Sequence, residues 1–223
     1  MSNFTFLAQN NEKDSYVKQA CLLAMSIRAT NRNSKICLIT NDKVPAEYDH
    51  LFNDIVPIPF QDTAKHDKWK VQNRWKIYHA TPYEETFVMD TDMLVLQDLS
   101  NWWNLMQNYK VFLTTKPKTY RQENIVDSYY RPSYVANELP NVYCAIHYFK
   151  KSNFAKQFYT WLELVMKNHE TFYKLYSPKR QQSFLSVDTS MAIVVKMLGI
   201  EEQVTNKKID FPNFVPVSYT HLT

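Results

Sequence analysis

Residues 87–96 read Phe87-Val88-Met89-Asp90-Thr91-Asp92-Met93-Leu94-Val95-Leu96. We expect this apolar run to be a strand with two carboxylates set into it. Asp is rare in strands, and an ionised carboxylate has a large desolvation cost unless a partner compensates it. Side chains alternate along a strand, so Asp90 and Asp92 would share one face while Thr91 points to the other. Mg²⁺ or Mn²⁺ is the partner that two convergent carboxylates favour, with substrate phosphates completing the ligands.

Helical and extended patterns alternate on both sides of this stretch, without internal repeats. Strands are expected over residues 4–7, 35–40, 54–58, 111–115 and 141–149. Helices are expected over 16–28, 66–80 and 153–168, from 100 onward, and from 186–188 to Gly199. This alternation predicts an α/β fold with a mostly parallel central sheet that helices cover on both faces.

Composition excludes several classes of protein. The 26 basic and 22 acidic side chains leave a net charge of +4, which is too mild for a nucleic-acid partner but suits anionic small molecules or loose contact with a membrane surface. Three widely spaced cysteines form no disulfide or zinc pattern and fit a reducing, cytoplasmic setting. Neither a signal peptide nor a transmembrane segment is expected. Gly199 is the only glycine, which excludes the glycine-rich phosphate loops.

Two segments carry a family resemblance. Residues 73–79, Asn-Arg-Trp-Lys-Ile-Tyr-His, together with the run from Phe87 to Leu99, resemble the donor-binding core of GT-A glycosyltransferases. The resemblance is nearest to the glycogenin-like and lipopolysaccharide galactosyltransferase-like group, and residues 16–42 and 141–150 support it. It implies a GT-A fold and the transfer of a hexose from a nucleotide-diphosphate sugar. Asp90 and Asp92 would form the metal-binding DxD motif for Mn²⁺ or Mg²⁺.

The same resemblance implies further residues that bind the donor. Arg74, on the preceding helix, would grip phosphate or sugar hydroxyls with its fork of donors, although a solvated helix arginine is the plain alternative. The loop after the first strand would hold the base and ribose. The candidates for binding the donor are Gln9, Asn10, Tyr16, Arg74, Asp90 and Thr91. Tyr16 could equally belong to the core at the start of its helix.

Asp90 and Asp188 are the candidate catalytic residues. Asp188 opens the last helix, where the family places an acidic or amide group facing the acceptor, so it would be a base in an inverting transfer or a polar positioner in a retaining one. The alternative is that Asp188 caps the helix or complements its dipole. Many relatives take a third metal ligand from a late histidine motif that this sequence lacks. His221 is a poor substitute, and His147 is expected to be a satisfied core histidine.

Residues 1–223 are expected to form a single catalytic domain. Its donor-binding half would cover about residues 1–115 and its acceptor-side half about 116–210. The polar, tyrosine-rich residues 116–140 are expected to be a long loop or lid. The tail, residues 211–223, ends in a run that resembles translated sequencing-adapter read-through, so we expect a truncated or non-native C-terminus.

The sequence therefore predicts a metal-dependent glycosyltransferase with a nucleotide-sugar donor and a glycan, lipid-linked or protein acceptor, and with peripheral membrane contact allowed. A non-catalytic carbohydrate-binding or assembly protein that keeps the fold is the alternative from another class. A nucleotidylyltransferase would need the missing glycine-rich loop. A nucleic-acid module on the aromatic and arginine residues of 120–134 fits the mild charge poorly.

Overall fold

The computed structural model describes residues 2–65, 70–118 and 131–206. They fall into two compact units. The first unit comprises Met1–Val111 and Ala145–Tyr159, and the second comprises Phe112–Cys144 and Thr160–Thr223. The residues of the expected tail, with His221, and the central part of the expected lid lie outside the described residues. The donor and acceptor roles assigned to the two halves of the chain stay predictions.

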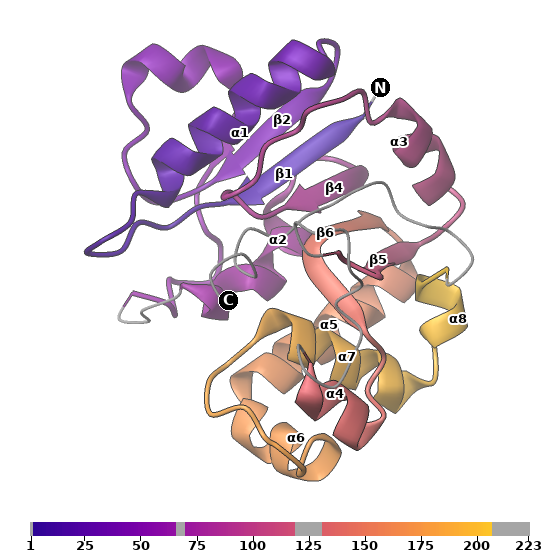
Figure 1. The fold of residues 1–223 in the computed structure, drawn as a ribbon. Coiled ribbons are helices and arrows are strands. Elements are labelled where there is room, and N and C mark those ends of the chain that lie inside the picture. Colours follow the sequence, from indigo (N-terminus) through magenta and orange to yellow (C-terminus); the bar gives the residue numbers. More distant parts are fainter. Residues whose placement is uncertain (1, 66–69, 119–130, 207–223) are drawn as a thin grey trace. The chain divides into compact units, whose positions relative to one another are not determined.

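In the part of the chain that the structure describes, the sheet has six strands in the order β3-β2-β1-β4-β6-β5. The strands are β1 (Asn3–Leu7), β2 (Lys35–Ile39), β3 (Asp54–Val56), β4 (Glu85–Met89), β5 (Val111–Thr115) and β6 (Val142–Lys150). β1 runs parallel to both β2 and β4, and β2 runs parallel to β3, whereas β4 and β6 are antiparallel. The predicted α/β architecture with a mostly parallel sheet is confirmed (Figure 1).

The helices of the first unit are α1 (Tyr16–Thr30), η1 (Ala46–Leu51), η2 (Val71–Lys76), α2 (Ile77–Ala80) and α3 (Ser100–Met106). Opposite faces of the sheet carry different partners because strand side chains alternate. On one face, Phe4 stacks on Phe87, and Phe87 meets Trp103 of α3 edge-on. On the other face, the hydroxyl of Thr5 bonds to that of Thr81, directly after α2. α2 and α3 therefore lie on opposite faces.

Three expectations differ from the structure. Residues 116–140 were expected to be a long loop or lid, but within their described part Pro132–Asn137 form the helix α4. Helix 66–80 was expected to be continuous, but its described part is the 3₁₀ helix η2 followed by the single turn α2, after Lys70 with a φ of 54°. The strand expected over 87–96 was too long, because β4 ends at Met89. Leu94 and Leu96 are exposed, so this half of the apolar run gains no burial from strand pairing.

The second unit is mainly helical. It contains α4 (Pro132–Asn137), α6 (His169–Tyr176), α7 (Val187–Leu198) and α8 (Glu201–Val204), while α5 (Asn153–Lys167) begins in the first unit. α7 ends where the sequence predicted, at Gly199, whose φ of 64° is the left-handed conformation that glycine adopts without strain. Among the described residues, no helix combines the length and apolarity needed to span a bilayer.

Candidate functional site

The two carboxylates lie at the carboxyl end of β4. The backbone N–H of Asp90 donates to the carbonyl of Ala145 at 2.9 Å, one residue beyond the last paired position of β4. Thr91 is buried, Asp90 is partly exposed and Asp92 is exposed. The burial of residues 90–92 alternates, but these residues follow the strand, whereas they were expected to lie inside it. Both carboxylates remain accessible to a ligand.

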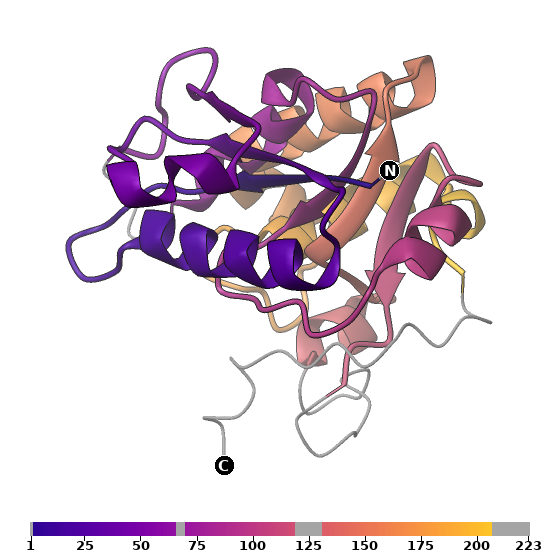
Figure 2. The same ribbon diagram turned by 90° about the horizontal axis from the view of Figure 1, so that it is seen from above.

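The chain after Asp92 runs along α1, as seen from above in Figure 2. The N–H of Val95 donates to the hydroxyl of Ser26 at 2.9 Å, and the N–H of Leu99 donates to the amide oxygen of Asn31 at 2.8 Å. Residues 90–99 are thus fixed at one end to the sheet and at the other to α1.

Sheet topology brings the exits of β1 and β4 together. β1 lies between β2 and β4. The chain first continues from β1 to β2 and β3 on one flank, and only later forms β4 on the other flank of β1. The pairs Phe4–Phe87 and Thr5–Val88 set the register, and its continuation brings Leu7 level with Asp90. In open α/β sheets, ligands bind outside the carboxyl ends of strands where the strand order reverses. The loop after β1 and the DxD motif occupy that position.

Arg74 holds Asp90 from η2. Its guanidinium nitrogen Nη1 lies 2.7 Å from Oδ1 of Asp90, with about a fifth of the arginine side chain and a third of the aspartate side chain exposed. A partly exposed ion pair of this kind contributes no more than about 1 kcal/mol, so its partners can exchange at low cost. Arg74 therefore lies beside Asp90, and its role toward a donor stays a prediction.

The pKa of the Asp92 carboxyl is raised above its ordinary value. Partial desolvation is the main cause, and the negative charge of Asp90 adds to it, while Arg74 opposes the shift. The positive charge of Arg74 thus offsets only part of the cost of ionising Asp92. A divalent cation bound to both carboxylates would supply the missing positive charge, and carboxylate oxygens are ligands that Mg²⁺ and Mn²⁺ prefer. Within residues 2–65, 70–118 and 131–206, no cluster of three His, Cys, Asp or Glu side chains is placed to hold a metal.

Tyr16 borders the same carboxylates from the first turn of α1. Its side chain is half-buried, and burial is the main reason that its pKa is raised. The negative charges of Asp14, Asp92 and Asp90 raise the pKa further, with Asp14 having the largest effect of the three. The positive charge of Arg74 lowers it. The structure therefore brings together Tyr16, Arg74, Asp90 and Asp92.

Gln9 follows β1 and is buried within a polar network. Its Nε2 donates to Oδ2 of Asp62 at 2.8 Å, and its Oε1 accepts from Nδ2 of Asn73 at 2.6 Å. Nδ2 of Asn73 also lies 2.7 Å from Oδ1 of Asp62. Both polar atoms of the Gln9 side chain thus have protein partners, and its role toward a nucleotide stays a prediction. The network fixes Asn73, the residue directly before Arg74.

Asn10 supports the start of α1. Its Oδ1 accepts from the N–H of Val17 at 3.0 Å, and its own N–H donates to Oδ2 of Asp42 at 2.7 Å. The first bond satisfies a backbone donor in the opening turn of the helix, which otherwise lacks an intrahelical partner. Asn10 therefore shapes the loop that carries Tyr16, and its contact with a base or ribose stays a prediction.

Asp188 belongs to the second unit, at the second residue of α7. Its Oδ2 is 2.5 Å from Nη2 of Arg131, and its Oδ1 accepts from the N–H of Cys144 at 2.7 Å. Ser186, and not Asp188, caps the helix through a bond from the N–H of Thr189. Both carboxylate oxygens are thus engaged by protein groups. The catalytic role of Asp188 stays a prediction.

His147 is confirmed as a satisfied core histidine. The side chain is buried, and its Nε2 lies 2.9 Å from the hydroxyl of Tyr159. Sequence reasoning did not single out Asp62, which organises the network beside the site. A lone aspartate in a polar loop carries no periodic signal, and only its partners in the folded chain distinguish it.

The fold of this chain is similar to that of solved glycosyltransferase structures. No protein-family model and no curated protein matches the chain. Among solved structures, the glycosyltransferase GlyE of Streptococcus pneumoniae TIGR4 is similar over 93% of this chain, with a TM-score of 0.55 and 13% identity. Mouse xyloside xylosyltransferase 1, in its apo form, is similar over 92% of this chain and 84% of its own, with a TM-score of 0.54 and 8% identity. The chain has a glycosyltransferase fold.

The glycosyltransferase fold predicted from the sequence is thereby confirmed, whereas the glycogenin-like or galactosyltransferase-like affiliation stays a prediction. The chain spans 45% of the length of the GlyE structure. At these identities the likeness concerns the fold alone.

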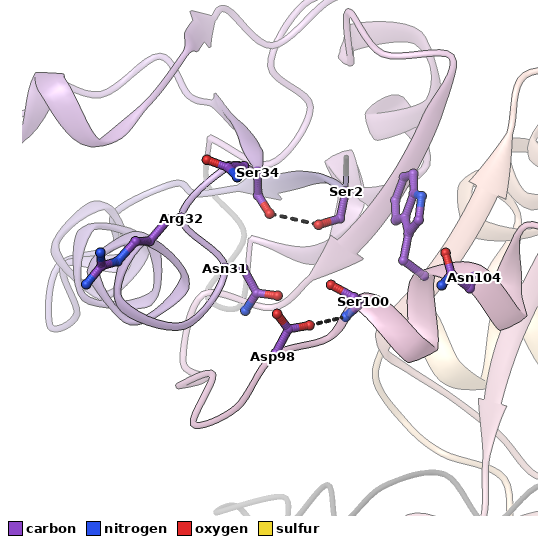
Figure 3. A pocket seen from close by; sticks show the side chains of 9 residues that line it. Ser2, Asn31, Arg32, Ser34, Asp98, Ser100 and Asn104 are labelled. Carbon is purple, nitrogen blue, oxygen red and sulfur yellow. Dashed lines mark hydrogen bonds between the residues drawn. The ribbon is translucent and has the colours of Figure 1, made fainter.

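A hollow of about 330 Å³ lies elsewhere in the glycosyltransferase fold (Figure 3). It is lined at the amino ends of β1 and β2 and at the start of α3, so it is not at the strand ends that carry the DxD motif. Its polar groups bond to one another: the hydroxyls of Ser2 and Ser34 lie 2.7 Å apart, and the N–H of Ser100 donates to Asp98 at 2.6 Å. None of the predicted site residues lines this hollow.

Proposed function

We propose that the chain is a metal-dependent glycosyltransferase that moves a hexose from a nucleotide-diphosphate sugar to a glycan, lipid-linked or protein acceptor. The observation that carries the proposal is the pair Asp90 and Asp92 at the reversal point of the sheet, with Arg74 on the first carboxylate and the second only partly compensated. This arrangement suits a site for a cation and a diphosphate.

Asp90 and Asp92 would hold Mn²⁺ or Mg²⁺ between them. Bound there, the cation would act as a Lewis acid that stabilises negative charge on the departing nucleoside diphosphate. Arg74 keeps the carboxylate of Asp90 oriented, and its other N–H donors suit phosphate oxygens. Tyr16, which is half-buried beside Asp90 and Asp92, would form one side of the donor site and exclude water from it.

Asp188 would act in the transfer as a base or as a polar positioner. Its contacts with Arg131 and Cys144 fix the orientation of the carboxylate, which suits a positioning role. The same contacts are equally compatible with a non-catalytic carbohydrate-binding or assembly protein that keeps the fold, which is the second candidate function.

Donor hydrolysis tests the proposal directly. A panel of nucleotide sugars would be incubated with Mn²⁺ and with wild type, Asp90→Asn, Asp92→Asn or Asp49→Asn. Asp49 is an exposed carboxylate on η1 and serves as the matched control. We expect wild type and the control to hydrolyse one donor, and the two site variants to lose about a hundredfold or more of that rate. Equal rates in Asp92→Asn and wild type would refute the metal assignment.

Calorimetry separates the two candidate functions. Titration of nucleoside diphosphates with and without Mn²⁺ should give binding that depends on the metal and disappears in Asp92→Asn. Absence of metal-dependent binding across the panel would favour the non-catalytic alternative.

A further inference from the structure

The loop after β3 has a strained backbone. Phe60 and Gln61 adopt φ angles of 59° and 66°, and neither is glycine. The left-handed region is unfavourable for a bulky residue such as phenylalanine, and two successive positions there persist only where the surrounding structure fixes them. Strain of this kind is concentrated at sites that hold a side chain in place for a purpose.

Two side chains of η2, those of Lys76 and Asn73, hold this backbone. Nζ of Lys76, a side chain with no solvent exposure, donates to the carbonyl of Gln61. Oδ1 of Asn73 accepts from the hydroxyl of Thr63 at 2.9 Å and from its N–H at 3.3 Å. These bonds are partly buried, and the Asn73 and Lys76 side chains that make them are fully buried, so the loop is held in one conformation where Phe60 leaves it.

The rigid loop presents the ring of Phe60 to solvent. Phe60 is 62% exposed, although its ring stacks on the indole of Trp75 with a centroid distance of 6.0 Å and an interplanar angle of 4°. The imidazole of His79 meets the same ring edge-on at 5.2 Å. Trp75 itself is only 3% exposed. The phenyl ring therefore has a fixed orientation, with the indole behind it and much of its surface open.

We propose that Phe60 is a stacking platform for a sugar ring of a glycan. The C–H face of a pyranose carries small positive partial charges and fits the electron-rich face of an aromatic ring. His79 and Gln61, both exposed, lie beside the platform and supply hydrogen-bonding groups for sugar hydroxyls. A single ring with a polar border suits a polar ligand that has one apolar face, whereas protein partners use broader apolar patches.

The platform belongs to the same edge of the sheet as the DxD motif. Asp62, two residues after Phe60, bonds to Gln9 directly after β1, and β1 ends beside β4. Binding at the platform needs neither the metal nor the donor, so the inference does not rest on the proposed transfer. It would serve a transferase and a non-catalytic carbohydrate-binding protein alike.

Saturation-transfer NMR tests the platform. The probes are soluble oligosaccharides of glucose, galactose or N-acetylglucosamine, four to six units long, without nucleotide or metal. The chain should bind at least one of them, and Phe60→Gly should bind it about tenfold more weakly. Glycine adopts a positive φ freely, which offsets part of the ring packing on Trp75 that the variant loses. The unfolding temperature, measured beside binding, separates lost binding from lost folding.

Two variants serve as controls. Phe184→Gly removes an aromatic ring of comparable exposure, 53%, from the second unit and should leave oligosaccharide binding unchanged. Phe60→Tyr keeps the aromatic face and should bind as wild type does. Equal binding by Phe60→Gly and wild type, or no binding of any oligosaccharide by wild type, would overturn the proposal. Loss of nucleoside diphosphate binding in Phe60→Gly would also overturn it, because the ring would then belong to the donor.

Discussion

Arg74 and Asp90 form an ion pair of 2.7 Å between a 3₁₀ helix and the end of a central strand. The pair joins the only cation among the predicted donor-binding residues to the first carboxylate of the DxD motif. It also affects the neighbouring site, since Arg74 opposes the rise in the pKa of Asp92.

Removal of Arg74 should weaken metal-dependent binding of a nucleoside diphosphate. We expect about a tenfold loss in Arg74→Ala, equal to about 1.4 kcal/mol, because a phosphate donor and a support of Asp90 disappear together. Arg74→Lys should fall in between, since it keeps the charge but loses the planar fork. Calorimetry measures both variants, with Arg32→Ala, an exposed arginine beyond the end of α1, as the control. Unchanged affinity in Arg74→Ala would contradict a role at the donor site.

Stability should depend on pH through Asp92. The pKa of Asp92 is raised in the folded chain, so its protonated carboxyl adds to the free energy of unfolding. This contribution is fully present below the pKa of the unfolded chain, about 3.9, and is lost as the pH rises through the higher pKa of the folded chain. At pH 7 without ligand, Asp92→Asn should be as stable as wild type or more stable, by no more than about 1 kcal/mol because the carboxylate is exposed. The difference should vanish near pH 3. Urea unfolding at both pH values measures it, and a less stable variant at pH 7 would contradict the assigned shift.

Asn73 should be important for the stability of the first unit. Asn73→Ala leaves the buried side-chain oxygen of Gln9 without its partner and also removes the acceptor of the exposed Thr63 hydroxyl, so we expect a loss of about 2–3 kcal/mol. Urea unfolding monitored by circular dichroism gives the value. The exposed Asn33→Ala should change stability by less than about 0.5 kcal/mol. Comparable losses of unfolding free energy in the two variants would show that the hydrogen bonds of Asn73 do not stabilise the first unit.

The pair Arg131–Asp188 should behave as a coupled unit. Arg131→Ala removes the buried partner of Asp188 and a donor to the carbonyl of Val142, and should cost about 3 kcal/mol. In the double variant Arg131→Ala with Asp188→Asn, the losses should be clearly less than additive, since no charge stays unpaired. The exposed pair Lys167–Glu163 provides the control, with a coupling of about 0.5 kcal/mol or less. Additive losses at Arg131 and Asp188 would contradict the coupling.

Much of the fold follows from local patterns. β5 and the end of α7 lie where the apolar run and Gly199 predicted them, because burial and backbone conformation act within a few residues there. The strand expected to reach Leu96 was too long, since hydrophobicity does not reveal which apolar residues find a neighbouring strand.

The candidate site was predictable only in part. Its DxD motif is a local signal, and a resemblance in sequence pointed to Arg74. The network of Gln9, Asp62 and Asn73 was not predicted, because it joins three separate segments and depends on how η2 packs against the end of β1. Two successive positive φ angles at Phe60 and Gln61 likewise have no signature in residue type.

The central position of β1 has a consequence for folding kinetics. This strand pairs with β2 about thirty residues later in the chain and with β4 only after residue 84, and β4 in turn pairs with β6 beyond residue 145. Pairing between segments so distant in sequence is slow, because loop-closure entropy is lost before the contacts form. Asp90 can meet Arg74 only once β4 has docked. During refolding, helical signal should therefore recover first, and the ion pair between Arg74 and Asp90, with the proposed binding of Mn²⁺, should return in a later phase.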